Sequence, residues 1–182
     1  TAANKFFKLN PYVADIPDTF SKDTNGVKLP AMGTLDVGGS GCVCPEHVML
    51  KSILSALTYR KDDVVIMDME AGLEHLGRGT AMNMEQFIVV IEPGARSVQT
   101  YRNVKRLAKD LGVKTVRVVA NKVRDEKDEE FIKASIPAED LLGMIHYNLE
   151  IMDADRQGKS PYDFSPKAIE EIRKIKEVLD RD

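Results

Sequence analysis

The chain has 182 residues, of which 43% are hydrophobic, and this is enough for one domain with its own core. Its 26 basic and 29 acidic residues give a formal net charge of −3, which disfavours nucleic acid as the main partner. No apolar run approaches the roughly 18 residues of a membrane span, and the first residues lack the apolar stretch of a secretory signal. The sequence predicts a single cytoplasmic domain over 1–182, with no membrane contact.

The N-terminal part of the chain predicts little helix. Prolines and scattered glycines interrupt the first 40 residues, so we expect short extended pieces and turns there. A helix is predicted over residues 45–59, because Pro45 suits a first turn and apolar residues recur at helical spacing. Those apolar residues are Val48, Met49, Ile53, Leu54 and Leu57.

Four short apolar runs are nearly continuous, as is typical of strands that are covered on both faces. They lie at 64–69, 87–93, 115–122 and 141–147. A helix is predicted over 97–111, ended by Gly112, with Val98, Tyr101, Val104, Ala108 and Leu111 on one face. Strands that alternate with helices of this length indicate βαβ units. We therefore expect an α/β fold with three layers, in which helices flank a mainly parallel sheet.

The last predicted helix begins at Ser165, with Pro166 in its first turn. Its apolar residues share one face, which we expect to dock on the sheet. They are Ile169, Ile172, Ile175 and Leu179.

Polar residues follow the first predicted strand at its carboxyl end, where ligands collect in open α/β sheets. Asp68 ends this strand, and Gly72 follows four residues later. A carboxylate there can hold the water shell of a nucleotide-bound Mg²⁺, and the glycine lets the backbone approach a terminal phosphate. The alternative is an aspartate that only caps the next turn.

Two later strands also end in residues that could contact a nucleotide base. Asn121 can make paired hydrogen bonds to a purine, while the stem of Lys122 packs over the ring. His146 and Tyr147 end the fourth strand, where backbone groups could also edge a base. The alternatives are an ordinary turn at 121–122 and a structural histidine at 146.

A phosphate-binding loop would have to accompany these residues, yet the sequence G-x-x-x-x-G-K-[ST] does not occur in the chain. The glycine run at 38–41 lacks the required lysine and Ser/Thr. Either the protein does not act on nucleotides, or the chain starts after its P-loop.

The two cysteines, Cys42 and Cys44, are separated by one residue and precede Pro45. Cys44 is the expected N-cap of the 45–59 helix, where the helix dipole favours a thiolate, the species that binds metal. In an extended segment, residues two apart point to the same side, so both sulfurs can face one ion. A closed site needs four ligands, which a two-fold dimer supplies. The alternative is two buried cysteines that only pack. His47 could add a nitrogen ligand to the site, and the alternative for it is a histidine on the surface of the helix.

With these residues in place, the chain resembles the CooC-type accessory ATPases for nickel insertion into carbon monoxide dehydrogenase, within the MinD-like branch of P-loop proteins. The resemblance rests on GGSGCVC (38–44), VVIMDMEAGLEHLGRGTA (64–81), VVIEPGARSVQT (89–100), LGVKTVRVVANKVR (111–124) and LLGMIHYN (141–148). It implies an ATP-dependent homodimer that holds nickel or zinc at the interface of its two subunits. It also implies that the protein delivers nickel to the dehydrogenase.

The resemblance also implies roles for individual residues. Cys42 and Cys44 would hold the metal, and Asn121 would contact the purine of ATP or ADP. Asp68 would hold the water shell of the Mg²⁺, and Gly72 would be the switch glycine. The family's K-G-G-x-G-K-T motif does not occur in these 182 residues, so we expect the chain to lack the first βα unit and, by itself, to be inactive in ATP hydrolysis. Glu70 is a further departure, close to the expected terminal phosphate.

Two other hypotheses remain open from the sequence. One is a MinD- or ParA-like regulatory or partitioning ATPase in which the cysteines play no part. The mixed charges of the predicted C-terminal helix disfavour a membrane-targeting version of it. The other is a metal-bridged dimerisation module without turnover.

Overall fold

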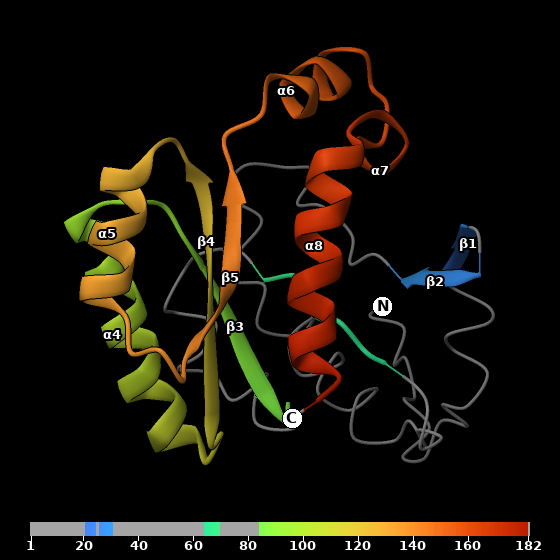
Figure 1. Ribbon diagram of the computed structural model, residues 1–182. Helices are drawn as coiled ribbons and strands as arrows, with labels where there is room; N and C mark the ends of the chain where they lie inside the picture. Colours follow the sequence, from blue (N-terminus) through green and yellow to red (C-terminus); the bar gives the residue numbers. More distant parts are fainter. Residues whose placement is uncertain (1–20, 25, 31–63, 70–83, 182) are drawn as a thin grey trace, which may run out of the picture. The chain divides into compact units, whose positions relative to one another are not determined.

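The computed structural model describes residues 21–24, 26–30, 64–69 and 84–181 (Figure 1). The chain divides into two compact units, Thr1–Asn83 and Met84–Asp182, and each is described by itself. The helix predicted over 45–59 lies outside the described residues, and a single domain over 1–182 stays a prediction. No helix in the described part of the chain is both long and apolar enough to span a bilayer.

The first unit contains a β-hairpin formed by β1 (Ser21–Thr24) and β2 (Val27–Pro30), which pair antiparallel. Gly26 lies in the turn with φ 84°, a left-handed conformation that favours glycine. Its N–H donates to Asp23 Oδ1 at 3.1 Å, so the aspartate side chain closes the turn. This hairpin is one of the short extended pieces that the prolines and glycines predict.

The prediction of a strand at 64–69 is wrong, because these residues have no regular secondary structure. The side chains of Val64 and Ile66 are 84% and 87% exposed. A strand requires a neighbour for its backbone N–H and C=O groups, and no described residue pairs with this segment. A continuous apolar run therefore predicts a buried strand only where a sheet exists on either side of it.

The second unit is built on a parallel sheet in the order β3-β4-β5. Its strands are β3 (Gln86–Ile91), β4 (Thr115–Val123) and β5 (Leu141–His146). Each one coincides with an apolar run of the sequence, so three of the four predicted strands are confirmed. The valines and alanine of β4 are buried, as expected of a central strand covered on both faces.

Helices cover both faces of this sheet, which confirms the predicted three-layer α/β class (Figure 1). The crossover helices α4 (Ala95–Leu111) and α5 (Glu126–Ser135) lie on one face, and α8 (Pro166–Leu179) lies on the other. Two successive right-handed crossovers in the same direction place their helices on the same side. The short helices α6 (Leu149–Arg156) and α7 (Pro161–Phe164), like α5, are absent from the sequence-based prediction.

The helix α4 follows the prediction closely. Val98, Tyr101 and Ala108 are buried on the face that the apolar spacing indicates. Gly112 has φ 80° and ends the helix in the left-handed conformation, donating its N–H to Lys109 O at 3.2 Å. The helix stop at Gly112 is confirmed.

The helix α8 begins where the sequence predicts, because Ser165 is its N-cap and Pro166 occupies its first turn. Ser165 is completely buried, and its side chain accepts the N–H of Ala168 at 3.4 Å. Ile175 packs with Val119 and Leu142 of the sheet. Ile172, in contrast, is 51% exposed, so its predicted docking is wrong. The helix packs mainly on β5, and Ile172 lies outside this contact.

Gly143 of β5 sets how closely α8 approaches the sheet. A Cβ atom at this position would lie 2.8 Å from Cγ1 of Ile175, which is closer than two carbon atoms can pack. Cγ1 is near the stem of a buried side chain and cannot swing away freely. The absence of a side chain at residue 143 is therefore a packing requirement.

We predict that Gly143→Ala lowers the free energy of unfolding by about 1–2 kcal/mol, because the new methyl group overpacks the contact with Ile175. Urea unfolding of the chain measures this cost. In an Ile175→Ala background, where the clashing atom is gone, the same substitution should cost almost nothing. An equal cost in both backgrounds would contradict the packing explanation.

A polar cluster joins α4 to the turn before β5. Asp140, only 9% exposed, accepts hydrogen bonds at Oδ2 from the hydroxyl of Tyr101 and from Nζ of Lys105. Burial by itself raises the pKa of the Asp140 carboxyl, but the bonds from Lys105 and Tyr101 outweigh it and leave the pKa below its usual value. The cluster therefore stabilises the ionised carboxylate and connects α4 to the residue directly before β5.

We predict that Asp140→Asn lowers the free energy of unfolding by about 1–2 kcal/mol at pH 7, since a charged hydrogen-bond acceptor is lost. A carboxyl with a lowered folded pKa stabilises the protein above its unfolded pKa of about 3.9, and this stability disappears as the pH falls through the folded pKa. Urea unfolding at pH 7 and near pH 3 should show the two proteins converging at acid pH. Asp110→Asn, an exposed change on the same helix, is the control and should have little effect.

Candidate functional site: the carboxyl edge of the sheet

The carboxyl ends of β3, β4 and β5 meet at one edge of the sheet, because all three strands are parallel. This arrangement brings together residues that are far apart in the sequence. Glu92 follows β3, Asn121 and Lys122 lie at the end of β4, and His146 ends β5 with Tyr147 directly after it. The four base-contacting residues that the sequence predicts thus lie on one edge, although their contact with a nucleotide stays a prediction.

The end of β4 is irregular at the position of Asn121. Ala120 is opposite Met144 and Val123 is opposite His146, so β4 has one more residue than β5 in this interval. Lys122, which lies in this interval, has φ 56°, a left-handed conformation that is uncommon for lysine. Asn121 Oδ1 accepts the N–H of Lys122 at 2.9 Å. Asn121 Nδ2 has no hydrogen-bond partner among the described residues, so its amide N–H groups are available to a ligand.

The Lys122 side chain crosses the edge to the neighbouring strand. Its Nζ lies 2.5 Å from Oε1 of Glu92, and both side chains are 57% exposed. The hydrogen bond from Lys122 to Glu92, together with the charge of that carboxylate, raises the pKa of Lys122. Sequence reasoning missed Glu92, although its place after the second apolar run follows the same rule that singled out Asn121.

His146 is held by carboxylates from two helices. Its Nδ1 lies 2.8 Å from Oε1 of Glu171 in α8, and its Nε2 lies 3.4 Å from Oε1 of Glu129 in α5. Its backbone N–H also donates to Glu171 Oε2 at 2.9 Å. Bonds from Lys133 and then from His146 lower the pKa of Glu129. Both ring nitrogens are therefore engaged within the protein, and His146 ties the two helix layers to the sheet.

The segment after β5 is also held in place. The N–H of Tyr147 donates to Val123 O at 2.8 Å, which extends the pairing past the end of β5. Asn148 caps α6 by accepting the N–H of Glu150 at 2.8 Å, and its Nδ2 donates to Ser165 Oγ at 2.6 Å. The tyrosine itself remains 47% exposed at the edge. Neither the Asn148 cap nor its bond to Ser165 follows from sequence spacing.

The remaining predicted site residues belong to the first unit. Asp68 is exposed within the irregular segment 64–69, while Gly72, Cys42 and Cys44 lie outside the described residues. No group of three or more potential metal ligands occurs in the parts of the chain that the structure describes. The Mg²⁺ and metal roles of these four residues stay predictions.

Comparison with known proteins adds to this geometry. No protein-family model matches the chain. The carbon monoxide dehydrogenase accessory protein CooC of Rhodospirillum rubrum is 46% identical over 160 residues, which are 88% of this chain and 61% of that protein. The chain is a relative of the CooC-type accessory proteins. This similarity and the helix-covered parallel sheet agree on a P-loop NTPase-like α/β fold.

Further relatives of this CooC-type chain are named as ATP-binding proteins. An uncharacterized ATP-binding protein of Methanocaldococcus jannaschii is 42% identical over 172 residues, 93% of this chain and 66% of that protein. Another from the same organism is 29% identical over 167 residues, 92% of this chain and 65% of that protein. The chain spans less than two thirds of the length of each of these relatives.

Proposed function

We propose that the protein to which this chain belongs is an ATP-dependent accessory protein that takes part in nickel insertion into carbon monoxide dehydrogenase. The observation that carries the proposal is the 46% identity to the carbon monoxide dehydrogenase accessory protein CooC. The names of the other relatives support ATP as the nucleotide. The carboxyl edge of the sheet supports it too, since ligands of open α/β folds bind there.

The base of the nucleotide is proposed to bind beside the irregular end of β4. The free Nδ2 of Asn121 can donate to a purine N7, and its Oδ1 retains one lone pair for the amino group of adenine, since only the N–H of Lys122 occupies it. Lys122, restrained by Glu92, places its aliphatic stem at the same edge. Tyr147 and the backbone after His146 form the other side of this proposed base site.

The phosphates and the metal cargo are proposed to involve the first unit. Asp68 would act on the Mg²⁺ that accompanies ATP, and Gly72 would approach the terminal phosphate. Cys42 and Cys44 offer two thiolates, which suit Ni²⁺ and Zn²⁺ alike. Two copies of the chain would then complete four sulfur ligands, so the proposal includes a homodimer.

Asn121→Asp tests the base site. The aspartate keeps an oxygen acceptor for the Lys122 N–H but lacks the N–H donors of the amide, so the affinity for ATP–Mg²⁺ should fall about tenfold, the equivalent of about 1.4 kcal/mol. Isothermal titration on the native protein that contains this chain measures it. Asn103→Asp on α4 is the matched control and should bind as the unsubstituted protein does. Unchanged affinity in Asn121→Asp would remove this residue from the base site.

The double change Cys42→Ser and Cys44→Ser tests the metal site. Because a hydroxyl is a poor ligand for Ni²⁺ or Zn²⁺ compared with a thiolate, we expect the bound metal to fall from about one ion per two chains to almost none. Elemental analysis after gel filtration reports both the metal and the oligomeric state. Undiminished metal content would exclude the cysteine pair as its ligands.

The second candidate is a nucleotide switch without a metal. The names of the Methanocaldococcus jannaschii relatives mention ATP binding alone. In this case the cysteine variant would bind ATP–Mg²⁺ as the unsubstituted protein does, while Asn121→Asp would bind it more weakly. The two substitutions together therefore separate the metal-carrying protein from a MinD- or ParA-like regulator.

A further inference from the structure

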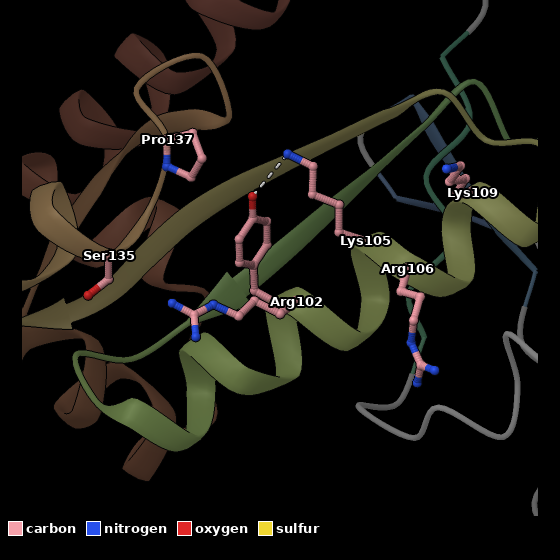
Figure 2. A pocket seen from close by; sticks show the side chains of 7 residues that line it. Arg102, Lys105, Arg106, Lys109, Ser135 and Pro137 are labelled. Carbon is pink, nitrogen blue, oxygen red and sulfur yellow. Dashed lines mark hydrogen bonds between the residues drawn. The ribbon is translucent and has the colours of Figure 1, made fainter.

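The solvent face of α4 has a row of four basic side chains that we call the basic stripe: Arg102, Lys105, Arg106 and Lys109. They are spaced i, i+3, i+4 and i+7, so they share one face of the helix over about 10 Å. All four residues are exposed. They border an open groove of about 480 Å³ whose opposite side is formed by Ser135 and Pro137, where α5 ends (Figure 2).

The stripe differs from the helix surfaces of the described structure on which basic side chains are paired. Lys133, Arg156 and Arg173 are all paired with a carboxylate one helical turn away. In the stripe, Lys105 is paired with Asp140, but Arg102, Arg106 and Lys109 make no hydrogen bond or ion pair with any described residue. Figure 2 shows the guanidinium groups of Arg102 and Arg106 extending from the helix without a partner among the residues drawn.

Repulsion between the basic side chains of the stripe makes the helix α4 less stable. Arg102 and Arg106, and likewise Lys105 and Lys109, are like charges at i and i+4, and such pairs destabilise a helix by about 0.2–0.5 kcal/mol each. The row also occurs in a chain whose net charge is −3, so it is not part of a generally basic protein. The basic side chains of the stripe repel one another, and three of them have no acidic partner among the described residues. Such a surface is suited to binding an acidic partner.

The cluster below the stripe keeps its position fixed. Tyr101 is 3% exposed and donates to Asp140, and Nζ of Lys105 lies 3.3 Å from the Tyr101 hydroxyl (Figure 2). Asp140 lies just before β5, at the amino edge of the sheet, and α4 also ends at this edge. The stripe is therefore held at the opposite end of the sheet from Asn121 and Lys122, and a partner there leaves the proposed nucleotide edge accessible.

We propose that the basic stripe is a docking surface for an acidic helix of a partner protein. Guanidinium groups bind carboxylates with paired, geometrically specific hydrogen bonds, and carboxylates one turn apart on a helix repeat at the same pitch as the stripe. The groove between α4 and the end of α5 provides the concave side against which such a helix can lie. The proposal does not depend on ATP binding or on the metal.

Other anionic partners fit this surface less well. A membrane-binding helix inserts exposed apolar side chains, and α4 has no exposed large hydrophobic residue. Duplex DNA is bound through a longer track of about 6–10 phosphate contacts, whereas the stripe has three unpaired cations and Asp140 beside them. A carboxylate-bearing helix matches both the length and the charge of the stripe.

The test uses the whole chain and a labelled, Ala-rich helical peptide of about 20 residues with Glu at i, i+3, i+4 and i+7. Fluorescence anisotropy at low salt should show binding that weakens as salt is added. The change R102E/R106E should reduce the affinity at least tenfold, because it reverses two of the three unpaired charges. The milder change R102Q/R106Q should reduce it several-fold, and circular dichroism verifies that both variants are folded.

The control is R156E/R173E, which makes the same change of charge at two exposed, already paired arginines, and it should bind the peptide as the unsubstituted chain does. Equal loss in the control, or no binding of the peptide to the unsubstituted chain, would overturn the proposal. Tighter binding to phosphatidylserine vesicles or to a DNA duplex than to the peptide, with the loss again confined to the stripe variants, would also overturn it in favour of that partner.

Discussion

The described structure depends on the parallel pairing of β4 with β3 on one side and β5 on the other. Because β4 is central and its valines are buried, the register of both neighbours is set by one strand. Parallel pairing directs all three carboxyl ends to one edge and requires crossover helices, which form the layer of α4 and α5. The proposed nucleotide edge and the basic stripe are both consequences of this arrangement, at opposite ends of the same sheet.

Charge has two different uses in this unit. Around Asp140 and His146, hydrogen bonds from neighbouring elements satisfy buried or half-buried polar groups and join helices to the sheet. On the solvent face of α4, similar basic side chains have no partner. The first arrangement stabilises the fold, whereas the second does not, and this contrast is why the stripe indicates recognition rather than structure.

Much of the fold could be predicted from local pattern. The helix α4 has a long apolar periodicity and a glycine at its end, and α8 has a Ser-Pro start, so both were expected with nearly correct bounds. The helices α5, α6 and α7 were missed because they are short and polar, and α5 buries only Asp128 and Ile132. The apolar run at 64–69 misled in the opposite direction, since composition alone does not report whether a neighbouring strand is present.

The sequence by itself determined the α/β class, three strands, the main helix boundaries and the polar residue types at the strand ends, because these follow from periodicity and from residues close together in the chain. Only the tertiary structure decided the partners of those residues. Lys122 meets Glu92 and His146 meets Glu171 across 30 and 25 residues of sequence. Such contacts depend on strand order and on the extra residue at the end of β4, and no local pattern encodes either one.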